Sequence, residues 1–149
     1  MSLTQYKQKR NLKKSGESKI RRAPKAQHPI YVIQKHKATN LHYDLRLEMN
    51  RVLKSWALPK PPPKTKSTKR LAIQVEDHPL SYATFEGTIP EGNYGAGKVE
   101  IWDSGTYELL DKDKKKIEIK ITGKKLKGNY VLIKTGYGKN KKGWLFFKI

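Results

Sequence analysis

The segment of residues 41–48 carries side chains that can bind a metal ion and a phosphate. Its residues alternate in polarity, and strand side chains point alternately to two faces, so the segment predicts a β-strand with one face packed inward. The apolar set is Leu41, Tyr43, Leu45 and Leu47. The opposite, solvated face carries His42, Asp44, Arg46 and Glu48.

A metal site follows from His36, which lies six residues before His42 and can return to it through a short loop. Two neutral imidazoles and one carboxylate, here that of Asp44, suit a divalent transition metal and leave positions open for substrate or water. Arg46, next along the same face, is suited to bidentate binding of a phosphate. The alternative is a strand face that is merely solvated, a common antiparallel pattern.

Another predicted strand, the segment 70–76, has polar residues that can take part in a site. Leu71, Ile73 and Val75 of this segment are predicted to point inward. If this strand lies near His42, then Arg70, His78 and Tyr82 can surround a phosphate, and a histidine there can bind its oxygens or transfer a proton. A bound metal would activate the attacking water. In the alternative interpretation His78 belongs to an ordinary turn and Tyr82 to the core.

Composition narrows the classes of partner. The chain has 149 residues, enough for one domain with a core, and its 33 Lys and Arg against 13 Asp and Glu give a net charge of +20. Such an excess favours a polyanionic partner, above all nucleic acid, with a membrane surface as the competing explanation. No apolar run approaches the roughly 20 residues of a membrane span, and no secretory signal is recognisable, so we expect a cytoplasmic protein. Without cysteine, metal ligands must come from His, Asp and Glu.

The order of segments predicts an all-β fold. Residues 1–29 form a basic arm, with nine Lys or Arg against one acid, and residues 30–149 form a single domain. Turn residues separate its short strands, and a Ser104-Gly105 turn is among the expected turns. We expect an extended Pro-rich loop at 60–69 and a long Gly-rich loop at 86–97, and the Gly-rich loop is interpreted as structural. We expect a compact antiparallel β-barrel, because closure removes exposed strand edges. The predicted strands are 30–34, 41–49, 52–58, 70–76, 98–102, 106–110, 116–121, 129–134 and 144–149.

The chain resembles the 3′-phosphoesterase domain of bacterial DNA ligase D, in its free-standing versions, over about residues 6–149. The resemblance lies in four blocks: Q-K-H-K-A-T-N-L-H-Y-D-L-R-L-E, V-L-K-S-W-A-L-P-K, K-R-L-A-I-Q-V-E-D-H-P-L-S-Y-A-T-F-E-G and I-P-E-G-N-Y-G-A-G. It implies a β-barrel with the site in a groove on its outer surface. It also implies a manganese-dependent enzyme of DNA repair by non-homologous end joining. Such an enzyme removes a 3′-terminal ribonucleoside and then hydrolyses the 3′-phosphate to a hydroxyl.

Site residues follow from this resemblance position by position. The implied metal ligands are His36, His42 and Asp44, and the implied substrate-binding residues are Gln34 and Ser55. In the basic arm, Asn11, Gly16 and Ser18 depart from the family pattern. The implied catalytic residues are His78, Arg46, Arg70, Tyr82, Lys60, Arg10 and Glu17.

The resemblance also implies a cofactor and partners. Mn²⁺ is the expected ion, and Zn²⁺ or Co²⁺ also suit two histidines and an aspartate. The expected substrates are DNA 3′ ends, with a separate ligase, polymerase or end-binding protein as further partners, no membrane, and a monomeric chain. Two alternatives stay open: a non-catalytic basic module that binds DNA ends, and a broader phosphodiesterase for RNA or cyclic phosphates.

Overall fold

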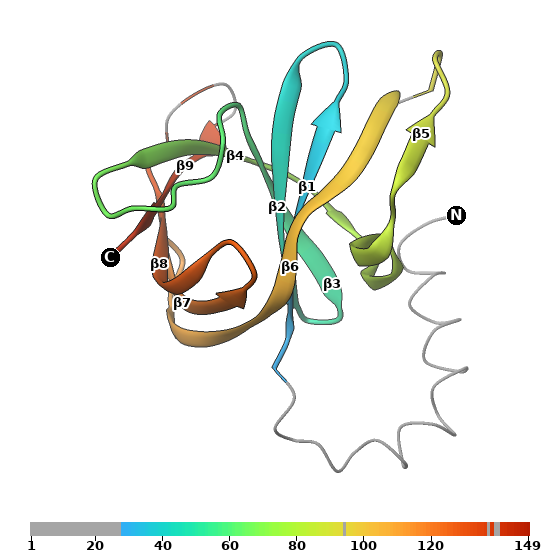
Figure 1. The fold of residues 1–149 in the computed structure, drawn as a ribbon. Coiled ribbons are helices and arrows are strands. Elements are labelled where there is room, and N and C mark those ends of the chain that lie inside the picture. Colours follow the sequence, from blue (N-terminus) through green and yellow to red (C-terminus); the bar gives the residue numbers. More distant parts are fainter. Residues whose placement is uncertain (1–27, 94, 137, 139–140) are drawn as a thin grey trace, which may run out of the picture.

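The computed structural model describes residues 28–93, 95–136, 138 and 141–149, so Arg10 and Glu17 lie outside the described residues. Their roles therefore stay predictions. Within the described part, the chain forms nine strands and one short 3-10 helix (Figure 1). They are β1 (Ile30–Lys37), β2 (Leu41–Met49), β3 (Val52–Leu58), β4 (Lys69–His78), η1 (Leu80–Thr84), β5 (Gly87–Ile89), β6 (Gly97–Lys112), β7 (Lys116–Gly123), β8 (Lys127–Lys134) and β9 (Gly143–Lys148).

The sheet closes on itself, which confirms the expected antiparallel barrel. Its strand order is β1-β2-β3-β4-β9-β8-β7-β6-β5, and β1 also pairs with β6. The ring therefore contains eight strands, and β5 lies outside it, along part of β6. Closure leaves no free edge within the ring, which is the physical advantage that favoured a barrel. The structure contains no helix, among the described residues, with the length and hydrophobicity of a membrane span.

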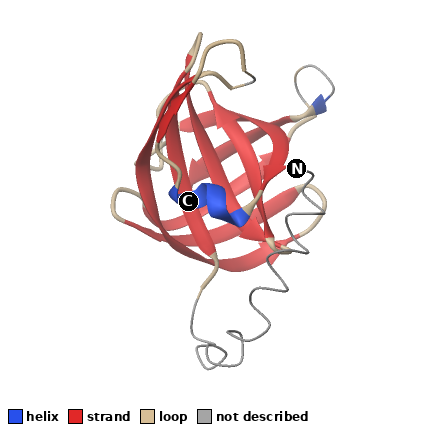
Figure 2. Cartoon of the chain, turned by 90° about the vertical axis from the view of Figure 1, so that its right-hand side faces the viewer, coloured by secondary structure: helices blue, strands red, loops and turns tan. Residues whose placement is uncertain are grey.

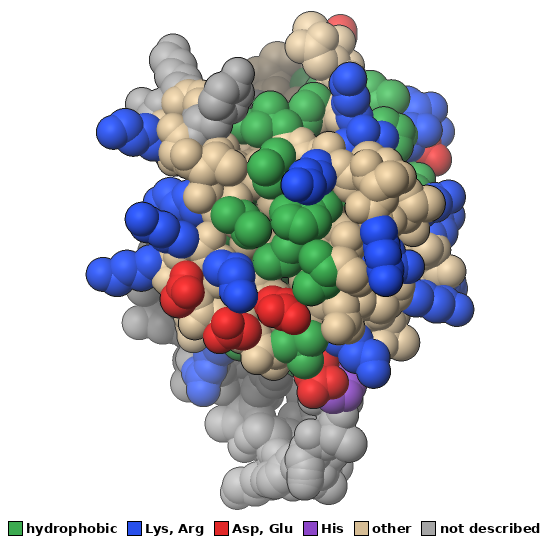
Figure 3. All heavy atoms as spheres, turned by 90° about the vertical axis from the view of Figure 1, so that its left-hand side faces the viewer, with side chains coloured by type: hydrophobic (Ala, Val, Ile, Leu, Met, Phe, Trp, Pro, Cys, Tyr) green, Lys and Arg blue, Asp and Glu red, His purple; other side chains and the backbone are tan. Residues whose placement is uncertain are grey.

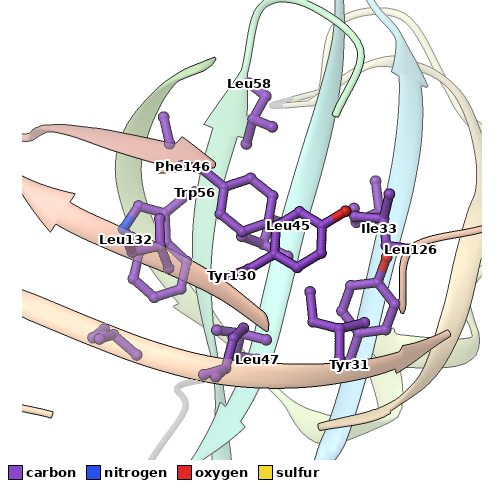
Figure 4. Close-up of a cluster of buried hydrophobic side chains, with 14 of the residues drawn as sticks. Tyr31, Ile33, Leu45, Leu47, Trp56, Leu58, Leu126, Tyr130, Leu132 and Phe146 are labelled. Atoms are coloured by element: carbon purple, nitrogen blue, oxygen red, sulfur yellow. The ribbon is translucent and has the colours of Figure 1, made fainter. Parts of the chain in front are cut away.

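The barrel interior is a single hydrophobic core. Side chains from opposite walls meet in it, as Figure 4 shows for Tyr31 of β1, Leu45 of β2 and Tyr130 of β8. Trp56 and Trp144 lie edge to face, with ring centroids 5.8 Å apart. The inward residues of β2 are Tyr43, Leu45 and Leu47, as predicted, whereas Leu41 is 47% exposed. Because inward and outward residues alternate, a filled interior places the polar residues of β2 on the outside of the barrel.

Strand β6 corrects the expected turn at Ser104-Gly105. These residues continue a strand of 16 residues, which pairs first with β1 and β5 and then with β7. Gly105 faces both Tyr31 of β1 and Gly123 of β7, and a Cβ at this position would collide with the carbonyl oxygen of Thr122. The glycine is needed for close approach of two backbones, not for a turn.

The faces of β4 also differ from the prediction. Ala72 is buried in the core, and Gln74 accepts a hydrogen bond from the indole of the core residue Trp144, so these two residues point inward. Leu71, Ile73 and Val75 consequently point outward, and the predicted inward orientation was wrong. The error arose because apolar residues occupy an outer face, where the alternation rule expects polar ones.

A second, smaller apolar cluster lies outside the barrel. Ala83 of η1 packs with Val32 of β1 and Leu53 of β3, and Leu80 and Tyr82 join them. The helix thereby lies across the outer surface of the sheet, as Figure 2 shows. It covers part of the polar face of the first strands, so that face is more enclosed than a solvated strand face.

Candidate metal and phosphate site

The two histidines and the aspartate predicted to bind a metal come together on the outer face of β1 and β2. Antiparallel pairing places His36 directly opposite His42, and a short connection joins the two strands. Asp44 lies two residues further along β2, on the same face. One ligand atom from each of the three residues lies within 4.8 Å of the other two. This arrangement fits a single divalent ion bound by two nitrogens and one oxygen.

The orientation of both imidazole rings is set by backbone carbonyls. His36 Nε2 lies 2.9 Å from the carbonyl oxygen of Gly95, and His42 Nδ1 lies 3.2 Å from that of Asn40. Their other nitrogens face the same atom, Asp44 Oδ2, at 3.8 Å for His36 Nδ1 and 3.3 Å for His42 Nε2. When each ring donates its distal N–H to a carbonyl, the lone pairs of the other nitrogens point to the ion position.

Gly95 and Asn40 are functional positions that sequence reasoning missed. Their contribution is a backbone oxygen, which no side-chain pattern reveals. The glycine content of the loop 86–97 was the available signal, because Gly95 has a φ of +77°, in the left-handed region that favours glycine. The loop was interpreted as structural, but it also helps to form the site.

Arg46 is fixed by four side chains beside this cluster. Its Nε donates to Gln34 Oε1 at 2.6 Å and its Nη1 to Ser55 Oγ at 2.8 Å, while Nη2 lies 3.4 Å from Asp44 Oδ2. Its Nη1 also lies 3.2 Å from His78 Nδ1. Arg46 is 3% exposed and Asp44 6%, so the predicted solvated face is wrong for these two residues. For Arg46, one physical reason is that the ring of Tyr82 in η1 covers the guanidinium.

His78 and Tyr82 close the site on the side of β4 and η1. Their ring centroids lie 4.9 Å apart, and the guanidinium of Arg46 lies 4.9 Å from the centroid of the Tyr82 ring. Both residues therefore line the same cavity as the candidate metal ligands, and their contact with a phosphate stays a prediction. His78 Nδ1 is also 3.1 Å from the carbonyl oxygen of Glu76. The tautomer that accepts from Arg46 at Nδ1 leaves its Nε2–H available to a ligand.

The electrostatics of the site favour a neutral His78. Burial lowers the pKa of His78, and the charge of Arg46 lowers it further. The hydrogen bond to Asp44 raises the pKa of His42, and burial raises the pKa of Tyr82. A neutral imidazole and a protonated phenol can both donate hydrogen bonds to phosphate oxygens at neutral pH.

These side chains line one cavity of about 420 Å³. This volume is within the range of small-ligand sites and is large enough for a nucleotide. Ala57, Val75 and Ile89 form apolar parts of its wall. The predicted residues that line it are His36, His42, Asp44, Arg46, His78 and Tyr82.

The other predicted residues lie elsewhere. Gln34 and Ser55 are buried and hold Arg46 from behind, without lining the cavity. Arg70 donates from Nε to the carbonyl oxygen of Pro61 at 2.6 Å, on the opposite face of β4 from Val75. Lys60 is exposed at the start of the Pro-rich loop. Contacts of Arg70 and Lys60 with substrate stay predictions.

The fold and the site together define a class: a closed antiparallel barrel with a candidate metal site and a buried guanidinium in one external cavity. The chain belongs to the DNA Ligase D 3′-phosphoesterase domain family, which it matches over residues 34–134. This result confirms the family inferred from the sequence motifs.

Longer proteins contain regions similar to this chain. It is 43% identical over 153 residues to the multifunctional non-homologous end joining protein LigD of Pseudomonas aeruginosa, covering 98% of the chain and 18% of that protein. Identity to LigD of Mycolicibacterium smegmatis is 45% over 155 residues, covering 96% and 20% respectively. Identity to the multifunctional non-homologous end joining DNA repair protein LigD of Mycobacterium tuberculosis H37Rv is 46% over 138 residues, covering 89% of the chain and 18% of that protein. The chain thus spans about a fifth of the length of these relatives.

Proposed function

We propose that this chain is a metal-dependent phosphoesterase that repairs DNA 3′ ends. It removes a 3′-terminal ribonucleoside by phosphodiester cleavage and then hydrolyses the remaining 3′-phosphate to a hydroxyl. The observation that carries the proposal is the convergence of His36, His42 and Asp44 next to Arg46 in one cavity. Membership of the 3′-phosphoesterase family supports the same substrate class.

His36 Nδ1, His42 Nε2 and Asp44 Oδ2 would hold the ion, with Mn²⁺ as the proposed ion. When bound, such an ion polarises a phosphate oxygen and lowers the pKa of a bound water. The donor set also suits Zn²⁺ and Co²⁺, so the choice of metal is tested separately below.

The remaining side chains bind and orient the phosphate. Arg46 presents a guanidinium already fixed by Gln34 and Ser55, so little reorganisation is needed when negative charge develops. His78, as a neutral imidazole, donates a hydrogen bond from Nε2 to a phosphate oxygen and so orients the phosphate. Tyr82 donates a hydrogen bond from its phenolic hydroxyl to a phosphate oxygen, and its ring covers the guanidinium of Arg46.

Four further residues complete the proposed substrate path. Arg70 and Lys60 lie near the Pro-rich loop, where they would contact the strand away from the reacting phosphate. Arg10 and Glu17 of the basic arm are proposed as further catalytic residues. The proposed partners are DNA 3′ ends and a ligase, polymerase or end-binding protein of the same end-joining pathway.

The test is phosphate release from a 3′-phosphorylated primer-template. We expect release with Mn²⁺, loss of release with a chelator, and loss by at least about 100-fold in His42→Ala, because one of three ligands is removed. Repeating the assay with Zn²⁺ and Co²⁺ ranks the metals. A primer that ends in one ribonucleotide tests the diesterase step, and an all-RNA strand tests the broader phosphodiesterase.

His28→Ala is the matched control, because His28 is exposed and lies outside the cavity. It should leave phosphate release unchanged. Undiminished release in His42→Ala would exclude the proposed metal site. DNA binding by the wild type without metal-dependent turnover would instead favour the non-catalytic binding module.

A further inference from the structure

Positive charge is spread over much of the surface, so charge alone does not locate a further binding site. Figure 3 shows Lys and Arg side chains over and around one whole side of the molecule. A more specific feature lies at the end of the barrel next to the β1–β2 turn. There, lysines from separate segments gather around two aromatic rings, those of Tyr43 and Trp102.

The two rings close this end of the barrel interior. Tyr43 is 6% exposed, whereas Leu41, the next residue on the same face of β2, is 47% exposed, so the interior ends at Tyr43. Trp102 lies edge to face with Tyr43, with ring centroids 5.9 Å apart. It packs against the core and stays partly exposed, so its ring can contact both the core and a ligand.

A β-bulge in β6 gives Trp102 this position. Gln34 pairs with Ile101 and Ile33 pairs with Asp103, so Trp102 is an extra residue without a partner on β1. Ile101 packs against the smaller apolar cluster outside the barrel, whereas Trp102 packs against the barrel core. Bulges that redirect a side chain are frequent next to functional sites, which supports a functional role for this ring.

Three lysines contact these rings. Lys35 of β1 lies over Tyr43, with Nζ 6.0 Å from the ring centroid. Lys64 and Lys125 lie over Trp102, with Nζ at 5.6 Å and 4.5 Å from its centroid. Among the ion pairs between described residues, none includes any of these three lysines. Cation–π contacts therefore hold three ammonium groups that the described carboxylates do not pair with.

Buried groups hold the two loops that supply Lys64 and Lys125. The Tyr130 hydroxyl donates to the carbonyl oxygen of Pro63, the residue before Lys64, at 2.8 Å. The buried carboxylate of Asp103 accepts from the backbone N–H of Lys125 at 3.0 Å. Because both backbones are already fixed, less conformational entropy is lost when a ligand orders these lysines.

Positive charge exceeds negative charge around the two rings. Lys37 and Lys98 form ion pairs with Glu100, at 3.6 Å and 3.9 Å, and Glu100 is the register partner of Lys35. The other carboxylate here, that of Asp103, is 3% exposed and accepts from four donors. Five lysines of the described chain thus surround two carboxylates. We call them the basic rim: Lys35, Lys37, Lys64, Lys98 and Lys125.

We propose that the basic rim binds the phosphate backbone of the DNA whose 3′ end occupies the candidate cavity. Lys35 precedes His36 along β1, and Tyr43 follows His42 along β2. Since neighbouring strand residues point to opposite faces, the rim and the metal ligands lie on the two sides of the same strand ends. DNA in the cavity can therefore extend over the β1–β2 turn onto the rim. The choice of DNA rests on the proposed function, whereas the rim itself rests on the contacts above.

The chemistry of the rim suits a phosphate backbone. Lysine binds phosphate as a point charge, and several lysines from separate segments match a row of regularly repeated charges. The partly exposed ring of Trp102 adds a surface on which a base can stack. An anionic membrane presents similar charges, but membership of a DNA ligase D domain family favours DNA.

The first experiment measures the affinity of the full chain for a fluorescent primer-template by anisotropy. The primer ends in a 3′-hydroxyl, and no metal is added. Lys64→Gln combined with Lys125→Gln should weaken binding about tenfold at low salt, because two phosphate contacts are lost. The slope of log affinity against log salt should become less steep by about 1.8, at about 0.9 for each contact.

The matched control is Lys114→Gln combined with Lys115→Gln, which removes the same charge. Both lysines are exposed in the turn between β6 and β7, at the opposite end of β7 from the loop that carries Lys125. This double variant should weaken binding by less than about twofold. If only the total charge mattered, the two double variants would lose affinity equally.

The second experiment follows tryptophan fluorescence during titration with the same DNA. Trp56 and Trp144 are 1% and 5% exposed, whereas Trp102 is partly exposed, so a ligand on the basic rim acts mainly on Trp102. DNA should change the emission of the wild type but not that of Trp102→Phe, which keeps an aromatic ring. Circular dichroism and thermal melting confirm that all variants remain folded.

Two results would overturn the proposal: equal losses of affinity in the two double variants, or an emission change that is absent from the wild type or persists in Trp102→Phe. Binding to phosphatidylserine vesicles without binding to DNA would assign the rim to a membrane instead. These measurements use DNA without a 3′-phosphate and no metal, so they do not depend on turnover. A chain that binds DNA through the rim but releases no phosphate would contradict the phosphoesterase proposal alone.

Discussion

Arg46 is the most constrained side chain of the site. Burying a guanidinium is costly unless its N–H groups have partners, and here Gln34, Ser55, Asp44 and His78 surround it. Burial lowers the pKa of Arg46, and the charge of Asp44 opposes that shift. The group nevertheless stays protonated, because an arginine is not deprotonated in proteins. The chain thus maintains a buried, oriented positive charge next to the candidate metal ligands.

Gln34→Leu tests this positioning role. The change leaves Arg46 Nε without its 2.6 Å acceptor while keeping a side chain of similar size. We expect turnover on a 3′-phosphorylated primer-template to fall about 10- to 100-fold, the equivalent of about 1–3 kcal/mol for an unsatisfied buried donor. Mn²⁺ affinity, measured by titration calorimetry, should stay within about twofold, because no ligand atom changes.

Gln74→Leu serves as the control for a lost buried amide. Gln74 accepts from the Trp144 indole at 3.2 Å and does not line the cavity of the candidate site. The Gln74→Leu variant should have a lower melting temperature than the wild type but the same turnover per folded molecule. If Gln34→Leu retained full turnover, Arg46 would not need the amide for its orientation.

Asp103 organises the loop between β7 and β8. Its carboxylate accepts hydrogen bonds from the backbone N–H groups of Lys124, Lys125 and Leu126 and from the Tyr31 hydroxyl. Asp103→Ala leaves these four donor groups without their acceptor, and Asp103 is buried. We expect the free energy of unfolding to fall by about 3 kcal/mol or more, measured by urea denaturation.

The same carboxylate predicts a pH dependence of stability. Burial alone raises the pKa of Asp103, but its hydrogen bonds lower it more, so the net pKa in the folded chain lies below its ordinary value of 3.8. Its contribution is therefore complete above about pH 5 and is lost as the pH falls towards the lowered pKa. Wild type and Asp103→Ala should converge in stability at acid pH. A constant difference between them down to about pH 2 would contradict this assignment.

At the scale of elements, the hairpins near the site could be predicted from sequence. The alternation in β2 and the Asn50-Arg51 turn were enough to predict the β2–β3 pair, and both turn residues have positive φ, as a two-residue hairpin favours. The spacing of His36 and His42 predicted their convergence. These features depend on contacts close in sequence, which local patterns record.

Features that depend on distant contacts could not be predicted in the same way. The outward orientation of Leu71 and Ile73 follows from the pairing of β4 with β9, where their partners come 74 and 70 positions later. The roles of Gln34 and Ser55 depend on the direction of the Arg46 side chain. The cover that η1 provides depends on its packing against β1 and β3. Periodicity identifies a strand, but it does not identify which face another element will cover.

Gly105→Ala tests the continuous strand β6. A methyl group there collides with the carbonyl oxygen of Thr122, at the point where β6 changes partners from β1 to β7. We expect a loss of stability of about 2–4 kcal/mol, because backbone must move to relieve the contact. Ser104→Ala, one residue earlier, should change the melting temperature little. If Gly105→Ala were as stable as wild type, the close approach of the two strands would be wrong.

At the scale of the whole molecule, the charge of +20 acts over a longer range than the cavity. When the basic surface binds a polyanion, counterions are released from the polyanion, and the resulting gain in binding free energy depends on the salt concentration. Contacts in a buried cavity depend on the salt concentration much less. The basic surface and the cavity should therefore contribute to different steps: the surface to binding of the DNA strand, the cavity to hydrolysis of its terminal phosphate.

This division predicts two salt dependences in one protein. The affinity for a 3′-phosphorylated primer-template, measured by fluorescence anisotropy, should fall linearly on a log-log plot, with a slope of about −0.9 for each phosphate neutralised. Turnover at saturating DNA should change much less over the same range. A nucleoside 3′-phosphate is the control, since it offers no strand to bind, and its hydrolysis should show a nearly flat salt profile. If DNA affinity were as insensitive to salt as that control, the excess of lysines would have no part in binding the substrate strand, and its explanation would have to come from another polyanionic partner.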